Sequence, residues 1–479
     1  MRARLLAQEN RKWWTLWAVA FALFMIMLDN TVVNVALPSI QRSLDAGISE
    51  LEWVVSAYAL TFAVLLLSGG KLADMFGRRR IFLLGLGVFA LSSLACGLAS
   101  SAGVLIAARS VQGVGAALMM PATLAIISAT FPPRERGLAI VIWAGVSAMA
   151  LAIGPLVGGL LTEHVNWNWI FYINVPVGAL GIVAGRIIIE ESRDTSHVQS
   201  LDLPGLLTSG AALFALTFGL IEANRYGWTS PAILGLFAAA AVGLVVFALI
   251  EHHRLAPMLD LSLFRSTTFT GGNIVAFLVT LAMFGVFFFM SLFVQRILGY
   301  SPVQAGAIFL PMTVLIVVVA PPAGKLSDHV GSRWLMAGGL TLVAGSLLIF
   351  SRLGVSSGFW DMLPGLLAGG MGMASVMTPM SAAVMGSVPV AKAGVASGVL
   401  NTSRQIGGAL GIAMMGAILT SRQASALSHG ASPPQAFLDG FQLALLVAAA
   451  IAFVGALTAA LLIRRGSHHE PAPAMEVAR

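Results

Sequence analysis

Long apolar runs separated by short polar segments make up almost the whole of this chain of 479 residues. The runs Leu83–Ser101, Val104–Ile127 and Ile233–Ile250 contain no acidic residue and at most one basic residue each. An α-helix rises about 1.5 Å per residue, so about 20 such residues cross the hydrocarbon core of a bilayer. The runs lack the alternation that is typical of barrel strands, so the pattern predicts an all-α membrane protein.

The same pattern predicts fourteen membrane-spanning helices. Their expected ranges are 14–38, 51–70, 81–100, 103–126, 138–161, 169–189, 203–222, 231–250, 269–294, 303–323, 335–352, 358–381, 396–420 and 441–463. The first run follows four basic residues, but it is too long for a signal peptide and many further spans follow it.

Basic residues are distributed unevenly between the two ends of these helices. If both termini are cytoplasmic, the outer loops hold five of the 27 Lys and Arg residues, Arg109 and Arg404 lie within helices, and the remaining 20 lie inside. The positive-inside rule therefore predicts that both termini are cytoplasmic. The net charge of +7 then reflects topology and contact with anionic lipids, and not binding to nucleic acid. With 58% hydrophobic and 10% charged residues, a soluble globular protein is excluded.

Two segments recur at the same distance along the chain. GKLADMFGRR at Gly70–Arg79 matches GKLSDHVGSR at Gly324–Arg333, and IQRSL at Ile40–Leu44 matches VQRIL at Val294–Leu298, both at an offset of 254. A repeated bundle with its site between the halves is typical of secondary transporters. We therefore expect a six-helix bundle over 1–190, two inserted helices with cytoplasmic linkers over 191–268, a second six-helix bundle over 269–465, and a cytoplasmic tail over 466–479.

A carboxylate and a guanidinium lie inside predicted helices. Asp29 is the only acidic residue well inside a span, whereas Glu222 and Asp361 lie at helix ends, where we expect them to reach water. A charge in the middle of a bilayer helix costs about 2.5–3.5 kcal/mol on insertion scales, so Asp29 and Arg109 are expected to face the interior and pair. A static pair that only fixes the first and fourth helices is the simpler alternative.

Three further groups of residues are candidates for function. In the loop GGKLADMFGRRR the glycines allow a tight turn, and charged pairs could hold one end of a half together as a latch. In ALAIGPLVGG, small residues on one face allow close helix packing and Pro155 bends the helix. The polar residues Asn34, Gln112, Asn401, Arg404 and Gln405 are candidates for lining a cavity. Generic basic loops and plain packing glycines are the alternatives.

No arrangement of residues that is typical of an enzyme is present. The chain has no HExxH zinc spacing and no GxxxxGK[ST] loop, and its single cysteine, Cys96, cannot form an internal disulfide. We therefore expect no enzymatic activity, no metal and no cofactor. Without a phosphate-binding loop, ATP cannot drive this protein directly.

These motifs together resemble the major facilitator superfamily, and most closely its fourteen-helix drug:proton antiporters of the EmrB/QacA type. The resemblance covers about Asp29 to Gly416 and rests on LDNTVVNVALP, GKLADMFGRR, RSVQGVGAA, GPLVGG, WNWIFYINVPVG and SGVLNTSRQIGGALG. It implies the major facilitator fold, two six-helix bundles plus two inserted helices. The resemblance carries over the loop-motif residues Gly70, Asp74, Gly77, Arg78 and Arg79, and an antiporter motif at Gly154, Pro155, Gly158 and Gly159. With Asp328 and Arg333 of the internal repeat, the loop-motif residues are our candidates for the conformational latch.

The resemblance leads to a functional hypothesis. We expect a monomeric efflux transporter that exports lipophilic drugs or antibiotics in exchange for protons, with Asp29 as the proton-coupling carboxylate and Arg109 as its partner. The 23 arginines against 4 lysines indicate a GC-rich genome, so we expect a bacterial plasma membrane and contacts with its lipids. The alternatives are an exporter dedicated to one metabolite or self-made antibiotic, a proton symporter, and a non-transporting membrane scaffold.

Overall fold

The computed structural model describes residues 8–193, 202–254, 257, 259, 261–388 and 393–464. Within these ranges the side chains of several α6 residues and of Asp328 and His329 are not described. The secondary structure of the described residues is helical throughout. The predicted tail over 466–479 lies outside the described residues.

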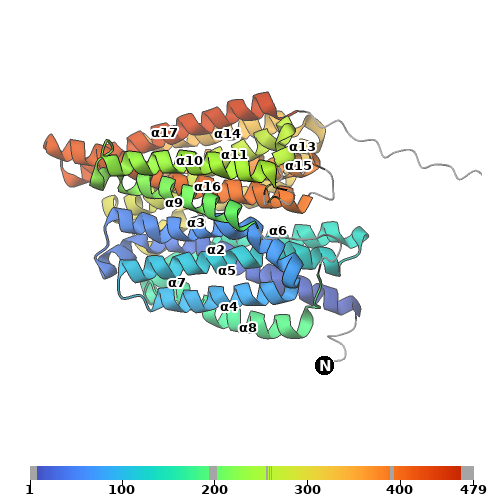
Figure 1. Cartoon of the computed structure of the whole chain (residues 1–479). Coiled ribbons are helices and arrows are strands. Elements are labelled where there is room, and N and C mark those ends of the chain that lie inside the picture. The colour runs from blue at the N-terminus through green and yellow to red at the C-terminus, as the bar shows by residue number, and fades with distance from the viewer. Residues whose placement is uncertain are drawn as a thin grey trace, which may run out of the picture.

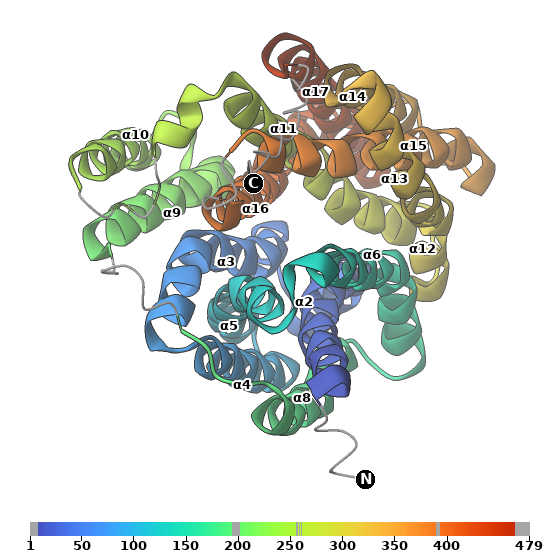
Figure 2. The same ribbon diagram turned by 90° about the vertical axis from the view of Figure 1, so that its right-hand side faces the viewer.

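The helices form two bundles that lie against each other, with a helical pair at their side (Figure 1, Figure 2). The first bundle contains α2 (Gln8–Leu44), α3 (Ile48–Phe76), α4 (Arg78–Gly97), α5 (Ala102–Thr130), α6 (Pro133–His164), α7 (Trp169–Tyr172) and α8 (Asn174–Ile188). The pair is α9 (Leu203–Tyr226) and α10 (Pro231–His253), and α9 packs against α3 and α16. The 3-10 helix η1 (Leu261–Arg265) leads into the second bundle.

The second bundle repeats the arrangement of the first. It contains α11 (Thr267–Leu292), the π-helix η2 (Phe293–Ile297), α12 (Pro302–Ile308), α13 (Leu310–Val330), α14 (Ser332–Phe350), α15 (Phe359–Gly386), α16 (Ala393–Ser428) and α17 (Pro433–Leu462). Helix α2 begins and α17 ends on the same side of the molecule, which we call the terminal face (Figure 1). The other side is called the opposite face.

Each predicted range contains a helix, and two of the ranges contain a break. The range 169–189 divides into α7 and α8, and 303–323 divides into α12 and α13. A proline lies just after each break, Pro176 and Pro311. Proline has no N–H, so it cannot donate to the carbonyl group four residues earlier, and the helical ladder is interrupted.

Twelve spans within the described residues are long and apolar enough to cross a membrane. The two predicted spans that are not among them coincide with α6 and α16. The polar run from Asn401 to Gln405 lowers the mean hydropathy of α16. The count of fourteen spans therefore stays a prediction.

Candidate functional site

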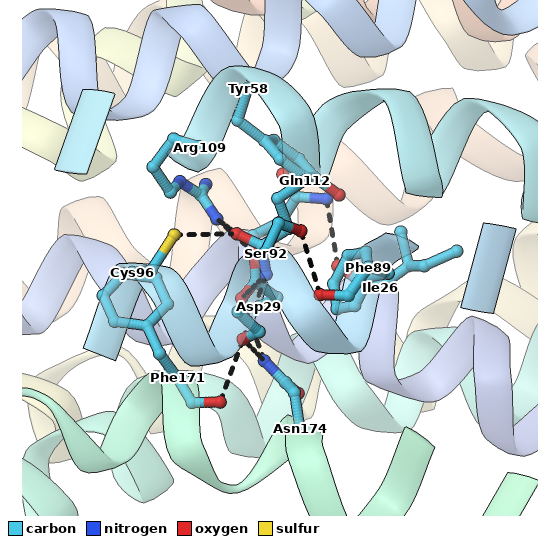
Figure 3. A network of polar contacts seen from close by, with 12 residues as sticks. Ile26, Asp29, Tyr58, Phe89, Ser92, Cys96, Arg109, Gln112, Phe171 and Asn174 are labelled. Atoms are coloured by element: carbon cyan, nitrogen blue, oxygen red, sulfur yellow. Dashed lines mark hydrogen bonds and ion pairs between the residues drawn. The ribbon is translucent and has the colours of Figure 1, made fainter. Parts of the chain in front are cut away.

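Asp29 and Arg109 form an ion pair in the interior of the first bundle (Figure 3). The carboxylate lies on α2 and the guanidinium on α5, and the side chains are 0% and 1% exposed. Arg109 Nη1 lies 2.5 Å from Asp29 Oδ2, and Arg109 Nε donates to the carbonyl oxygen of Val54 at 3.1 Å. The predicted meeting of these two charges is therefore present in the structure.

Two amide side chains complete the coordination of the Asp29 carboxylate. Gln112 Nε2 donates to Asp29 Oδ1 at 3.0 Å, and Asn174 Nδ2 donates to the same oxygen at 3.1 Å. Both amides also donate to Ser93 Oγ, which donates to the carbonyl oxygen of Phe171. Gln112 Oε1 accepts from Arg109 Nη1 at 2.7 Å. The Asp29 carboxylate thus joins α2, α5 and α8, and Ser93 adds α4 to the network through the two amides.

Aromatic rings close the network against the surroundings. The guanidinium of Arg109 lies 4.2 Å from the ring centroid of Tyr58 and 5.8 Å from that of Phe171. Such cation–π contacts stabilise an arginine that has lost its water. Because both side chains are buried, the interaction between the two charges is strong. Removal of either one leaves the other as an uncompensated buried charge.

The Asp29 carboxylate can either form the ion pair with Arg109 or carry a proton. While Asp29 is ionised, it accepts three hydrogen bonds from Arg109, Gln112 and Asn174. A proton on Asp29 would remove its charge and one acceptor site, and would leave Arg109 without a counter-ion. The two charge states therefore favour different packing of α2, α5 and α8.

The repeated segment near residue 70 is mostly helical, which corrects the expectation of a glycine-rich turn. Helix α3 continues to Phe76, and only Gly77 separates it from α4. Gly77 has φ of 108°, and a Cβ atom there would lie 2.7 Å from the Glu191 carboxyl carbon. Gly70 is helical, and Asp74 pairs with Arg78 one turn later at 2.9 Å. Continued helix satisfies the backbone groups that a turn would leave free.

The charges on this segment join helices of the first bundle at the terminal face. The backbone N–H of Arg79 donates to Glu191 Oε1 at 3.0 Å, and Arg11 pairs with Glu190. Lys12 pairs with Glu135 at the start of α6. No ion pair between described residues joins the first bundle to the second at this face. Lys71 of this segment also reaches beyond the first bundle, because its Nζ donates to the carbonyl oxygen of Pro257 at 2.7 Å.

The repeated segment in the second bundle has a similar backbone shape at its glycine. Gly331 has φ of 91°, as Gly77 has a positive φ in the first half. Ser327 Oγ and Ser332 Oγ lie 2.8 Å apart where the first half has an ion pair. Arg333 stacks on Trp334, with its guanidinium 4.8 Å from the ring centroid. The Asp328 side chain lies outside the described residues.

The glycines of the predicted antiporter motif make contacts in two directions. A Cβ atom on Gly154 would meet Thr31, and one on Gly158 would lie 2.7 Å from the carbonyl oxygen of Val32, so this face packs on α2. A Cβ atom on Gly159 would lie 2.5 Å from the carbonyl oxygen of Pro302 on α12. The motif therefore brings three helices together at the opposite face.

Contacts between the two bundles are well defined at the opposite face. Gly306 on α12 packs on the backbone of Pro155, where a Cβ atom would lie 2.2 Å from the carbonyl oxygen. Glu163 Oε2 accepts from the backbone N–H of Val303 at 2.8 Å, and Gln295 Nε2 donates to the carbonyl oxygen of Val35 at 2.9 Å. At this face the two bundles pack against each other with backbone atoms in close contact, so the face is closed.

The residues predicted to line a cavity fall into different environments. Gln112 belongs to the buried network around Asp29, so it does not line a cavity in this structure. Asn34 and Gln405 are half-buried, and Asn34 Oδ1 has no hydrogen-bond partner. Asn401 donates to the carbonyl oxygen of Ser397 in its own helix. Arg404 Nη2 donates to Ser381 Oγ on α15 at 2.9 Å.

Glu52 and Glu222 are among the buried acidic residues that the sequence reasoning missed. Glu52 is 2% exposed and packs against Gly416 on α16, and Glu222 on α9 is 7% exposed instead of reaching water. The two carboxyl groups are near enough to interact electrostatically. Both residues lie near helix ends, where charges are usually solvated, so their positions gave no signal. Asn174 and Ser93 were missed because small polar residues are common in membrane helices.

Comparisons with known proteins all point to one family of membrane transporters. The model of the Major Facilitator Superfamily matches residues 19–412 and 273–478. The Tetracenomycin C resistance and export protein of Streptomyces glaucescens is 35% identical over 506 residues, covering 97% of this chain and 94% of that protein. Multidrug resistance protein Stp of Mycobacterium tuberculosis is 39% identical over 409 residues, covering 85% and 76%.

A further relative and a solved structure agree with this family. The Methylenomycin A resistance protein of Streptomyces coelicolor is 39% identical over 418 residues, covering 87% of each chain. The structure of a bacterial homolog of the human lysosomal transporter Spinster, in an inward-facing and unoccupied conformation, superposes with a TM-score of 0.68. At 19% identity and 96% and 99% coverage, that similarity concerns the fold.

Proposed function

The chain belongs to the Major Facilitator Superfamily, and on this premise we propose that it exports lipophilic drugs or antibiotics in exchange for protons. It is a multi-pass membrane transporter of small molecules and not an enzyme. Its relatives are named for resistance to antibiotics or multiple drugs and for export. Drug efflux is the function that these relatives support.

The finer features of the proposal follow the sequence resemblance. We place the protein in the fourteen-helix EmrB/QacA type, with α6 and α16 as the spans beyond the twelve. The terminal face is then cytoplasmic, and the membrane is a bacterial plasma membrane. The protein works as a monomer among lipids and needs no cofactor, because the proton gradient drives it.

The observation that carries proton coupling is the buried Asp29 carboxylate with its three hydrogen-bond donors. Intramembrane ionisable residues usually mark ion or proton pathways. When Asp29 takes up a proton, Arg109 loses its counter-ion, and the packing of α2, α5 and α8 that depends on the ion pair is weakened. Loss of the proton restores the pair. This alternation would couple proton movement to the exchange between two conformations.

Transport in everted membrane vesicles tests this proposal. Uptake of a lipophilic dye, tested both as the cation ethidium and as the anion fluorescein ethyl ester, and the release of protons are measured together. The unchanged protein is compared with Asp29→Asn, which keeps the side-chain shape. Asp439→Asn is the control, because Asp439 is a half-buried carboxylate on α17 whose hydrogen bond, accepted from Gln435, stays within its own helix. We expect proton-linked uptake in the unchanged protein and the control, and none in Asp29→Asn.

Two outcomes would change the proposal. If Asp29→Asn still couples uptake to protons, another group carries the proton. If the unchanged protein moves neither dye and releases no protons, an exporter dedicated to one metabolite or antibiotic becomes the better assignment. A resistance panel that includes tetracenomycin C and methylenomycin A then separates narrow export from broad export, since these compounds appear in the names of its relatives.

A further inference from the structure

Arg404 is a cation inside the second bundle without a carboxylate partner among the described residues. One of its nitrogens, Nη2, donates to the neutral hydroxyl of Ser381, and buried Nε has no hydrogen-bond partner. An unpaired guanidinium inside a membrane is costly, and such residues usually face a bundle interior or a polar cavity. Arg109, by contrast, has Asp29, Gln112 and the carbonyl oxygen of Val54.

The position of Arg404 on α16 directs it toward the interior of the protein. Helix α16 contacts the inserted helix α9 through Thr420 and the carbonyl oxygen of Ala417, both contacted by Asn224. Arg404 and Thr420 are 16 residues apart, which at about 100° per residue places them on nearly opposite sides of the helix. Arg404 therefore points away from α9 and toward α15, where Ser381 lies.

Few carboxylates could receive a cationic substrate. Asp29 is fully buried and already has three donors. Glu52 is 2% exposed and lies in the contact between α3 and α16, beside Glu222 of α9. From η1 to the end of α17 the sequence has three acidic residues, Asp328, Asp361 and Asp439, all near helix ends. Asp202 at the start of α9 and Glu251 near the end of α10 are also buried; Asp202 pairs with Arg254, and Glu251 accepts from the backbone N–H of Leu259. In the interior of the described second bundle, the charge without a counter-ion is that of Arg404.

A second positive site lies where a substrate would leave. A cavity of about 650 Å³ at the opposite face is lined by Arg42, Gln295, Arg296 and Tyr300 among others, and none of its lining residues is acidic. Arg42 and Arg296 occupy equivalent positions of the repeat IQRSL and VQRIL, so duplication has brought two like charges to one cavity. The volume is within the range of sites for drug-sized ligands.

We propose that the exported molecules are organic anions, such as carboxylates or acidic phenols, and that Arg404 binds their anionic group inside the membrane. Arg42 and Arg296 then receive the same group at the opposite face. A planar guanidinium donates two parallel hydrogen bonds to a carboxylate, or a charge-assisted hydrogen bond to the single oxygen of a phenolate. This inference rests on the proposed export function and names its substrate class.

Equilibrium binding to the purified full-length protein tests the charge preference without any gradient. Fluorescein ethyl ester, ionised as an anion, and rhodamine 6G, a cation with the same xanthene skeleton, are titrated against the unchanged protein and followed by fluorescence anisotropy. We expect the anion to bind at least about tenfold more tightly, which corresponds to about 1.4 kcal/mol. Equal affinities, or tighter binding of the cation, would overturn the proposal.

Variants at Arg404 locate the preference. We expect Arg404→Gln to lose the tenfold preference and Arg404→Lys to keep part of it, because lysine retains the charge but not the planar fork. Arg352→Gln removes an exposed charge and is the matched control. If Arg404→Gln does not fold, the double variant Arg42→Gln, Arg296→Gln tests the second site and should weaken anion binding. A preference for the anion that is unchanged in all these variants would exclude these arginines as its binding groups.

Transport separates this inference from the proposed function. When one proton enters and one monovalent anion leaves, a net of two positive charges moves inward. When one proton enters and one monovalent cation leaves, no net charge moves. We therefore expect anion export to be accelerated by a potassium diffusion potential that is negative on the cytoplasmic side. A protein that binds the anion but moves no protons would contradict proton coupling and leave the substrate class standing, whereas proton-coupled export of cations only would do the reverse.

Discussion

Two arginines lie inside the membrane-spanning part of this protein, and their surroundings differ. Arg109 in the first bundle is 1% exposed, pairs with Asp29 and stacks on Tyr58. Arg404 in the second bundle has the hydroxyl of Ser381 and no carboxylate partner among the described residues. The same side chain is thus part of a closed, neutral network in one half and a free positive charge in the other. On the proposals above, Asp29 in the first half holds the proton, and Arg404 in the second half binds the substrate inside the membrane.

Replacing the two arginines by leucine gives the largest expected contrast. Arg109→Leu leaves Asp29 as a buried charge without its partner, so we expect a loss of about 3–5 kcal/mol in the free energy of unfolding and no transport. Arg404→Leu removes a charge that has no counter-ion, so we expect stability to stay within about 1 kcal/mol or to rise. Thermal unfolding in detergent measures both. Equal destabilisation would mean that Arg404 also has an ion-pair partner.

The second-largest effect is expected from disturbing the contact between the two bundles at the opposite face. Gly159→Leu places a side chain against the backbone of Pro302 on α12, where even a Cβ atom would lie 2.5 Å from an oxygen. Overpacking of this kind costs about 1–3 kcal/mol, so we expect the closed face to be disfavoured and transport to fall at least about tenfold. Gly235→Leu is the control, because a Cβ atom there meets nothing within 4 Å. Transport that falls equally in both variants would contradict this role of Gly159.

Removing one neutral partner from each arginine environment sharpens the comparison. Asn174→Ala deletes the donor to Asp29 Oδ1 and Ser93 Oγ, and leaves buried acceptors short of a hydrogen bond. We expect it to cost about 1–2 kcal/mol of stability and to slow proton-linked transport. Ser381→Ala should cost less than about 1 kcal/mol, because Arg404 is only half-buried. Unfolding of the two variants by urea or heat measures these losses of stability. A larger loss of stability in Ser381→Ala than in Asn174→Ala would contradict the comparison.

The smallest effect is expected at Glu52. Glu52→Gln removes one of two neighbouring buried carboxyl groups in the contact between α3, α9 and α16 while keeping the volume of the side chain. We expect stability to change by less than about 1 kcal/mol and proton-linked transport to continue. Vesicle transport with Asp29→Asn alongside measures this. Loss of coupling in Glu52→Gln would place a second proton-carrying group outside the first bundle.

The pairing of Asp29 with Arg109 could be predicted from the sequence, because a buried charge needs an opposite charge and the chain offered one acidic residue well inside a predicted span. Its other partners could not. Asn174 lies 145 residues from Asp29, in a run of aromatic and apolar residues that gives no sign of polar contact. The two roles of the antiporter glycines also escaped prediction, since the i, i+4 spacing indicates a packing face but not which helix packs on it.

The segment around residue 70 was predicted in part. Its positive-φ glycine and its charges are present, but the turn is confined to Gly77 and the residues before it are helical. Sequence reasoning placed the end of the helix at the glycines because glycine has low intrinsic helix propensity. Packing overrode that preference, as Gly70 lies against Pro121 of α5.

The sequence by itself determined the membrane class, the ranges of the helices, the repeat and the family, because each of these depends on apolar length and local motifs. Only the tertiary structure decided that Asp29 is closed in by four helices, that Gly159 meets the second bundle, and that Arg404 has no carboxylate partner among the described residues. Those facts depend on how each helix is rotated and on which distant segments lie beside it. A bilayer crossing constrains the length of a helix, whereas side-chain packing between helices selects its neighbours.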